Sequence, residues 1–442
     1  MEQVNLESLY PDTAWNTEIE ELAGFIKNGT SCQLLSIPGA GRSTILGLLA
    51  HNSKVRLKHF GRDSAIHFVP VHFSEVKKRP LFDVMKFLFL SLADSLRARK
   101  MGEYGKVNNL FKESLGFKDE LVLFQALKEA IDYLALERKL KIVFLFDRFE
   151  EYVPKVTAEF FTNLRTLRNR AKYQFSVVFS LNRPLEDLLE QDQLFDFYEF
   201  IAGHYVYSGL YDKSTTDFRV AYIEKITHKK ILAKLIAEIL IETGGVGRLI
   251  KLSVETVLSP QGAIDDKNFG DYLYSQKLIQ SALMQICASL LPSEQAVLIN
   301  DKFDDSAAVK YLETVGILKD KKIQIPLFER HIKSHVGKFK QSTKVIVFDD
   351  NTNSIKMGEV VLSDQLTSSE FRLLKFFLLN PERIVERDEM ISVVWSSVKS
   401  TAGITDQAVD QLVFRLRRKI EDDPNNPVHL LTVKGRGFKF EG

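Results

Sequence analysis

The sequence predicts a multidomain protein with an α/β domain, a helical region and two winged helices. Three observations support this. Apolar runs alternate with helical patterns over residues 1–210, which is typical of a parallel sheet wound with helices. Only helical periodicity follows over residues 211–288. Compact helix-and-hairpin patterns occupy residues 289–340 and 341–442, and the last of these begins with a small β-sheet.

The α/β domain is predicted from four apolar runs that are rich in Val, Ile, Leu and Phe. These runs are Cys32–Ile37, Ala65–Phe73, Lys141–Phe146 and Phe175–Leu181. They show little alternation between polar and apolar residues, as expected for strands that are buried on both faces of a parallel sheet.

Charge, cysteine count and hydropathy exclude several classes of protein. The chain is 45% hydrophobic and 27% charged, with a net charge of +2, so any nucleic-acid contact must come from a local patch. Cys32 and Cys287 are too few for a disulfide framework, which fits a reducing cytoplasm. Charged residues interrupt the most apolar stretch, Pro80–Leu96, so we expect a buried amphipathic helix and no membrane partner.

The last hundred or so residues read as a small sheet, three helices and a hairpin. The predicted strands are Val345–Phe348 and Glu359–Leu362, and the predicted helices are Leu366–Leu379, Val385–Trp395 and Thr405–Glu421. Thr367 with Glu370 is a capping pair for the first helix.

The third helix has two chemically distinct faces. Its apolar face comprises Val409, Leu412, Val413, Leu416 and Ile420, and its polar face comprises Gln407, Gln411, Arg415 and Arg418. Gln can bond adenine edges and Arg can bond guanine in a bidentate manner, while Arg417, Arg418 and Lys419 can neutralise phosphates. The polar face therefore has the chemistry of a helix that enters the major groove.

A basic hairpin follows this helix. Gly435 and Gly437 permit a tight turn within Leu430–Phe440, which places Lys434 and Arg436 at its tip. A basic helix alone is as often a merely solvated face, but the helix and hairpin together favour DNA binding.

Residues 345–442 resemble the effector domain of OmpR/PhoB-type response regulators. The matching stretches are "LTSSEFRLLKFFLLNPERIVERDEMISVVW", "ITDQAVDQLVFRLRRKIEDD" and "LLTVKGRGFKF". The resemblance implies that Gln407, Gln411 and Arg415 contact DNA from the third helix, and that Lys434 and Arg436 do so from the wing. Phe414 departs from the pattern and would contact a thymine methyl or pack on a neighbouring domain. No phosphoacceptor domain is visible, so control by aspartyl phosphorylation is not expected.

A phosphate-binding loop is predicted between the first strand and the next helix. The segment "LLSIPGAGRSTILGLLA" departs from the pattern G-x-x-x-x-G-K-[ST], because Ser36 replaces the first glycine and Arg42 replaces the lysine. Backbone amides can still face a phosphate, and the Ser43 hydroxyl could hold Mg²⁺. The candidate nucleotide-binding residues are Pro38, Gly39, Ala40, Gly41, Arg42, Ser43 and Thr44.

Three further elements follow in the order expected of a nucleotidase. Asp147 ends an apolar strand, which is where a nucleotidase carries the acid that holds the Mg²⁺ shell. Glu150 or Glu151 could orient a water. Arg183 follows the next strand at a position that would face the γ-phosphate, and Arg248 begins a helix after "TGGVG". Each element alone has an ordinary structural explanation, and it is their order that favours a nucleotide site.

This set is similar to AAA+/STAND-type ATPases, including origin-recognition-like ones, in which a P-loop sheet, a helical lid and a winged helix follow in order. The resemblance implies ATP or ADP with Mg²⁺, and a homo-oligomer is a further partner to consider. "PDTAWNTEIEELAGFI" resembles the adenine-side segment of that family. Arg165, Arg168 or Arg170 could act as an arginine finger, although such a run is more often a solvated face.

We therefore expect a cytoplasmic, nucleotide-controlled transcription regulator that binds double-stranded DNA, with at most weak ATPase activity. Two alternatives stay open. One is a DNA-stimulated ATPase that loads or remodels, and the other is a degenerate scaffold that binds no nucleotide.

Overall fold

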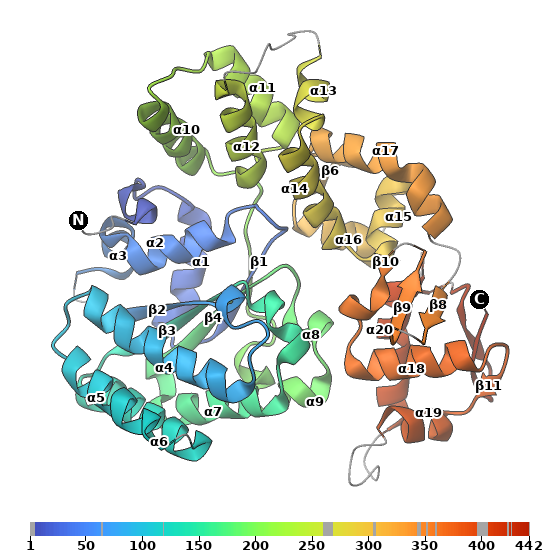
Figure 1. Ribbon diagram of the computed structural model, residues 1–442, viewed down its shortest axis with the longest axis horizontal. Coiled ribbons are helices and arrows are strands. Elements are labelled where there is room, and N and C mark those ends of the chain that lie inside the picture. The colour runs from blue at the N-terminus through green and yellow to red at the C-terminus, as the bar shows by residue number, and fades with distance from the viewer. Residues whose placement is uncertain are drawn as a thin grey trace. The chain divides into compact units, whose positions relative to one another are not determined.

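The computed structural model describes residues 5–62, 65–117, 119–259, 268–303, 306–342, 346–350, 352–358, 360–395, 405–421, 424–425 and 427–441 (Figure 1). The chain divides into two compact units. The first comprises Met1–Ala237 and Gly245–Gly262, and the second comprises Glu238–Gly244 and Ala263–Gly442.

The first unit is built on a five-stranded parallel sheet in the order β2-β3-β4-β1-β5. Its strands are β1 (Cys32–Leu35), β2 (Ile66–His72), β3 (Lys141–Asp147), β4 (Phe175–Leu181) and β5 (Tyr205–Tyr207). The four strands predicted from the sequence are confirmed, and β1, β3 and β4 are buried almost throughout. The three-residue strand β5 was not predicted.

Helices cover both faces of this sheet (Figure 1). One face carries α1 (Asn16–Lys27), α2 (Arg42–His51) and α3 (Ser53–Phe60), and the other carries α4 (Leu81–Ala98), α5 (Tyr104–Leu115), α6 (Glu120–Asp132) and α7 (Ala158–Ala171). Successive side chains of a strand point to opposite faces, so β3 contributes Ile142, Phe144 and Phe146 to one core and Val143 and Leu145 to the other. The predicted amphipathic helix is α4, and its apolar side is buried.

The region after the sheet is helical, as predicted. Short helices α8 (Leu185–Leu188) and α9 (Gln191–Leu194) follow β4, and after β5 come α10 (Lys213–Thr227), α11 (Ala233–Thr243), α12 (Gly247–Leu258), α13 (Phe269–Tyr274) and α14 (Lys277–Ala288).

Residues 292–342 form the predicted helix-and-hairpin pattern within the second unit. Its elements are α15 (Pro292–Asn300), α16 (Ala307–Thr314), β6 (Leu318–Lys319), β7 (Lys322–Ile323) and α17 (Pro326–Ser342). The Ser306 hydroxyl caps α16 by accepting from the Val309 amide at 3.4 Å.

The last part of the chain has the predicted winged-helix elements. They are β8 (Ile346–Asp349), β9 (Ser354–Met357), β10 (Val360–Val361), α18 (Ser368–Leu379), β11 (Ile384–Val385), α19 (Arg387–Val394), α20 (Asp406–Ile420), β12 (Leu430–Val433) and β13 (Gly437–Phe440). The capping pair of Thr367 and Glu370 is present at the start of α18. Val345 and Glu359, where two strands were predicted to begin, lie outside the described residues.

Candidate nucleotide site and DNA-binding surface

Two glycines in the loop between β1 and α2 have backbone conformations that other residues rarely adopt. Gly39 has a φ of +88° and Gly41 a φ of +121°, values that a side chain disfavours. Helix α2 begins at Arg42, and its N-cap residue, Gly41, has no side chain that could accept from the first amides. Because those amides have no partner within the helix, the start of α2 is suited to an anion.

Three of the strands and helix α2 bring polar groups to the same edge of the sheet. The Asp147 carboxylate, at the end of β3, accepts from the Ser43 hydroxyl at 2.9 Å and from the Ser180 hydroxyl at 3.4 Å. His72, at the end of β2, has its Nδ1 atom 3.3 Å from the other Asp147 oxygen. In an open α/β sheet, ligands bind at this carboxyl edge.

Electrostatics favour a charged Asp147. Burial raises the pKa of this carboxyl, but hydrogen bonds from His72 and Ser43 outweigh burial, and its pKa is lowered overall. The same hydrogen bond raises the pKa of His72. An ionised carboxylate beside a serine hydroxyl is an oxygen donor set that suits Mg²⁺.

The arginine that replaces the P-loop lysine is held by an acid. Arg42 Nη2 donates to Glu150 Oε1 at 2.8 Å, and these side chains are 9% and 20% exposed. Arg42 Nη1 and Glu150 Oε2 are buried without a hydrogen-bond partner among the described residues. A buried guanidinium with an unused donor at the start of α2 fits a phosphate group, which would have to compete with Glu150 for Arg42.

The remaining predicted site residues outside the loop are Glu151, Arg183 and Arg248. Glu151 does not face Arg42, since it bonds Ser74, Lys77 and Arg148 instead. Arg183 follows β4 and is 4% exposed. The Arg248 amide donates to Gly39 O at 3.0 Å, so the start of α12 contacts the loop.

Both loop glycines are also crowded by side chains of the same unit. A Cβ atom at Gly39 would lie 2.9 Å from Arg248 Cβ, and one at Gly41 would lie 2.5 Å from Trp15 Cζ2. Trp15 comes from the segment predicted to lie on the adenine side, and its Nε1 is buried without a partner among the described residues. Close packing is therefore a second reason why these positions are glycines.

The three arginines considered as fingers all have partners in their own chain. Arg165 pairs with Asp196, Arg170 pairs with Asp132, and Arg168 lies over the rings of Tyr173 and Phe200. These contacts favour the solvated-face interpretation.

Sequence reasoning missed His72 and Ser180. Neither belongs to a local motif, and each joins the site only because parallel strands end at one edge. His72 pairs with Asp147 in the β2–β3 register, so a correct strand alignment would have found it.

The predicted recognition helix, α20, packs by its apolar face and exposes its polar face. Val409, Leu412, Val413, Leu416 and Ile420 are buried together with residues of α18 and α19. Gln407 and Gln411 are exposed, and Phe414 is 45% exposed. The Phe414 ring therefore lies on the same side of α20 as the two amides and is available to a thymine methyl.

The basic residues near the end of α20 differ in their surroundings. Arg417 donates to Leu430 O and to Thr432 Oγ1, which ties the helix to the first wing strand. Lys419 is 6% exposed and donates to Glu370 at 2.6 Å, so the expectation that it neutralises phosphates is wrong. Arg415 and Arg418 are partly exposed.

The wing is an antiparallel hairpin of β12 and β13. Its tip exposes Lys434, Gly435 and Arg436, and the Arg436 amide donates to Val433 O at 2.9 Å to close the turn. The hairpin therefore presents two cations at its tip, as predicted.

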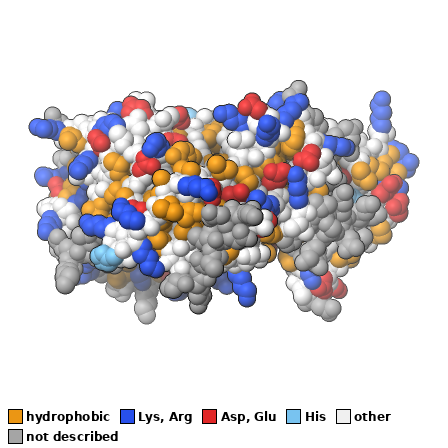
Figure 2. Space-filling model, turned by 90° about the horizontal axis from the view of Figure 1, so that it is seen from above, with side chains coloured by type: hydrophobic (Ala, Val, Ile, Leu, Met, Phe, Trp, Pro, Cys, Tyr) orange, Lys and Arg blue, Asp and Glu red, His pale blue; other side chains and the backbone are white. Residues whose placement is uncertain are grey.

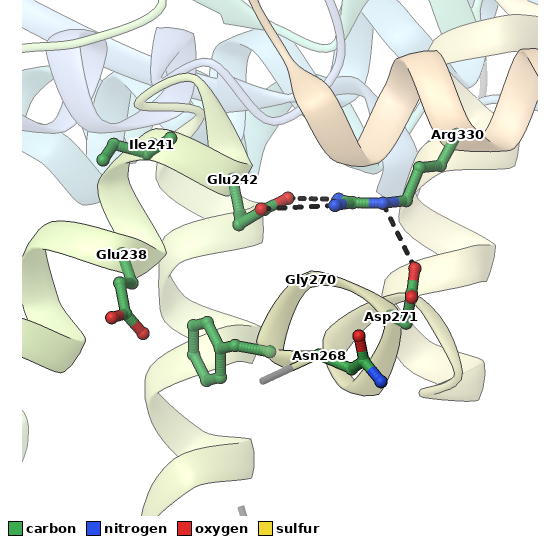
Figure 3. A pocket seen from close by; sticks show the side chains of 8 residues that line it. Glu238, Ile241, Glu242, Asn268, Gly270, Asp271 and Arg330 are labelled. Atoms are coloured by element: carbon green, nitrogen blue, oxygen red, sulfur yellow. Dashed lines mark hydrogen bonds and ion pairs between the residues drawn. The ribbon is translucent and has the colours of Figure 1, made fainter. Parts of the chain in front are cut away.

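A pocket of about 230 Å³ lies within the second unit, and none of the residues that line it is a predicted site residue (Figure 3). Arg330 of α17 bonds Glu242 through both terminal nitrogens, and its Nε atom lies 3.3 Å from Asp271. The two carboxylates thus compensate the one cation, and the network joins the end of α11 to α13 and α17.

The described residues contain no single helix that is long and apolar enough to cross a membrane. The bent pair Lys277–Ala288 and Pro292–Asn300 meets that test only by length and composition.

Residues 363–440 match the family model described as "Transcriptional regulatory protein, C terminal". The sensory transduction protein RegX3 of Mycolicibacterium smegmatis is 46% identical over 77 residues, which is 17% of this chain and 32% of that protein. The regulatory protein VirG of Rhizobium rhizogenes is 34% identical over 98 residues, or 21% of this chain and 39% of that protein. The chain spans about a third of the length of these curated relatives.

Among solved structures, a Walker-type ATPase of Pyrococcus abyssi superposes on 80% of this chain and 97% of its own, with 15% identity and a TM-score of 0.41. The ORC1 protein of Aeropyrum pernix, solved in complex with DNA, covers 79% of this chain and 90% of its own, with 12% identity and a TM-score of 0.38. The chain combines a five-stranded parallel sheet in its first unit with a C-terminal region that matches the transcription-regulator family model.

Proposed function

We propose that this chain is a cytoplasmic transcription regulator that binds specific double-stranded DNA and is controlled by ATP or ADP with Mg²⁺. DNA would bind to the polar face of α20 and to the wing, and nucleotide to the loop between β1 and α2. The observation that carries the proposal is the exposure of Gln407, Gln411 and Phe414 on a helix whose opposite face is buried.

The chemistry of this surface supports sequence-specific binding. Glutamine amides can make paired hydrogen bonds to adenine, and an aromatic ring can contact a thymine methyl. Lys434 and Arg436 at the wing tip add contacts that depend on salt and not on sequence. Arg417 would act indirectly, because its bonds to β12 fix the angle between helix and wing.

The loop site supports nucleotide control. Bound ATP would supply the triphosphate, and a Mg²⁺ ion bound with it would offset the phosphate charge. Ser43 and Asp147 would hold the cation, the first amides of α2 would face the phosphates, and Arg42 would exchange Glu150 for a phosphate oxygen. Arg248, which touches the loop through its amide, would carry the change to α12.

Hydrolysis would be weak in this proposal. Arg148 occupies the position directly after Asp147, where such ATPases usually carry an acid that orients the attacking water. A DNA-stimulated ATPase is the alternative, and phosphate release that rises with added DNA would favour it.

A scaffold that binds no nucleotide is favoured by one specific observation, the packing of Trp15 and Arg248 against the loop glycines. The variant Arg42→Ala distinguishes the two proposals. It weakens ATP binding if Arg42 contacts phosphate, whereas a chain that shows no ATP binding at millimolar concentration with Mg²⁺ is a scaffold.

DNA selection from a random library, run with and without ATP and Mg²⁺, tests target preference and control together. We expect a defined site whose affinity changes with nucleotide. Gln411→Ala should cost about 1–3 kcal/mol of discrimination at one base pair. Lys375→Gln, on α18, is the matched control and should leave the preference unchanged. A random output from the selection would refute the regulator function.

A further inference from the structure

The amino-terminal edge of the sheet in the first unit carries a group of basic residues that the proposed function does not use. Strands β2 and β3 begin side by side at this edge, where Ile66 pairs with Lys141. Arg99, near the end of α4, donates to Ile66 O and to Ala50 O, and Arg56 of α3 donates to the same Ala50 carbonyl.

The group continues across the edge. Lys141 Nζ donates to Lys27 O at the end of α1. Lys27 Nζ in turn lies 5.9 Å from the Phe60 ring at the end of α3. Arg56, Arg99, Lys141 and Lys27 therefore form one connected set, which we call the basic edge.

Exposed cations flank the basic edge. They are Lys58 and Arg62, on and just after α3, and Lys139, just before β3. Helix α3 contains no acidic residue. Several acids close in sequence to these cations are engaged elsewhere: Glu20 bonds His59, Asp94 bonds Arg97, Glu103 bonds Arg138 and Glu137 bonds Lys106.

Within the described residues, Arg56, Arg99 and Lys141 form no ion pair with a carboxylate, which distinguishes this edge. On the face of the molecule in Figure 2, Lys and Arg side chains are spread among Asp, Glu and hydrophobic side chains. At the basic edge, by contrast, Arg56, Arg99 and Lys141 donate to backbone carbonyls, and Lys27 lies near the Phe60 ring. The charge of Lys27 also acts on the Glu20 carboxylate, whose first partner is His59.

Bringing these positive charges together costs electrostatic free energy, and a bound anion would reduce that cost. Burial lowers the pKa of Arg56 and of Lys141. Burial, with a contribution from the nearby Arg56 charge, lowers the pKa of Arg99 to about 10. These cations are therefore partly desolvated and lie close to one another.

We infer that the basic edge is a second nucleic-acid surface, which binds the phosphate backbone of duplex DNA without reading its sequence. Several cations in a connected row fit a polyanion better than a single phosphate. Because residues 363–440 match the transcription-regulator family model, duplex DNA is the polyanion that we expect the basic edge to meet. A membrane surface fits less well, because α3 exposes Leu57 but no broad apolar face.

The test uses the full chain and the triple variant Lys27→Gln, Arg62→Gln, Lys139→Gln. These side chains are exposed, whereas Arg56 and Arg99 hold the carbonyls of α2 and are left intact. The matched control is Lys78→Gln, Lys112→Gln, Lys155→Gln, which removes the same charge from exposed positions elsewhere in the unit.

The readout is the dependence of DNA affinity on salt. Each phosphate contact adds about 0.9 to the slope of log K against log salt, so the basic-edge variant should lower this slope by about 2–3 on duplexes longer than the selected site. Its base preference should not change, and the control variant should match the wild type in both. An unchanged slope in the basic-edge variant, with wild-type thermal stability, overturns the inference.

A second background separates this inference from the proposed function. Gln411→Ala with Arg415→Ala removes base reading, and the residual DNA binding of that chain should weaken further when Lys27, Arg62 and Lys139 are also replaced by Gln. Tighter binding of the wild type to phosphatidylserine vesicles or to polyglutamate than to duplex DNA would identify another class of partner and overturn the inference.

Discussion

The ion pair between Arg42 and Glu150 makes a quantitative prediction about nucleotide affinity. If a phosphate must displace Glu150 from Arg42, then removing the competing charge should strengthen binding. The two atoms are 2.8 Å apart, and both side chains are largely buried. A charge-assisted hydrogen bond of this kind contributes about 1.5–3 kcal/mol, and Glu150→Gln keeps the shape and part of the bond. We therefore expect tighter binding by about 1–2 kcal/mol, or roughly 5–30-fold.

The assay is a titration of a fluorescent ATP analogue in the presence of Mg²⁺, with hydrolysis measured in parallel. Glu150→Gln should raise affinity while any hydrolysis falls, because the same carboxylate is a candidate to orient water. Glu151→Gln is the matched control, since that neighbouring acid bonds Lys77 and Arg148 and should leave affinity unchanged. Equal or weaker binding by Glu150→Gln would show that phosphate does not compete for Arg42.

Three further predictions concern stability. Gly437→Ala should destabilise the C-terminal domain by about 3 kcal/mol, because φ is +124° and the new Cβ would lie 2.1 Å from Val385 O. Glu370→Gln should cost about 3–5 kcal/mol in denaturant unfolding, because it leaves Lys419 buried without its counter-charge. Burial lowers the pKa of His67 to about 3, below its value of about 6.5 in an unfolded chain. The contribution of neutral His67 to the free energy of unfolding is therefore complete above about pH 6.5 and is lost as pH falls toward 3. His67→Gln should flatten the dependence of stability on pH in this range.

The glycine and glutamate predictions each have a control in the same chain. Gly435→Ala, at a φ of +73° with open space around the new Cβ, should cost only about 1 kcal/mol. Glu389→Gln removes a more exposed ion pair with Arg383 and should change stability by about 0.2–1 kcal/mol. Equal losses for the two glycine variants, or for the two glutamate variants, would contradict the reasoning from packing and burial.

The fold could be predicted from the sequence wherever one periodicity dominates. The four apolar runs of the sheet and the two faces of α20 were read from spacing alone, and both are confirmed. Strand β5 was missed because three residues, Tyr205–Tyr207, are too short for a pattern to stand out from a loop.

The site was predicted only as far as local motifs reach. Ser43 and Asp147 lie 104 positions apart, yet both belong to motifs, and the structure brings their side chains within 2.9 Å. His72 belongs to no motif and could not be found without the register of β2 against β3. Lys419 was assigned to the wrong environment because its partner, Glu370, lies 49 positions away on another helix.

The two edges of the sheet would recognise anions by different physics, and this difference can be measured. At the carboxyl edge, a single arginine and the amides of α2 would face phosphate in a largely buried site, where salt screens little. At the amino edge, exposed lysines and arginines would release counter-ions when DNA binds, so affinity there falls steeply with salt. Raising the salt concentration should therefore weaken DNA binding far more than ATP binding. If salt weakened ATP binding and DNA binding equally, Arg42 would bind phosphate as an exposed charge, which would contradict its burial beside Glu150.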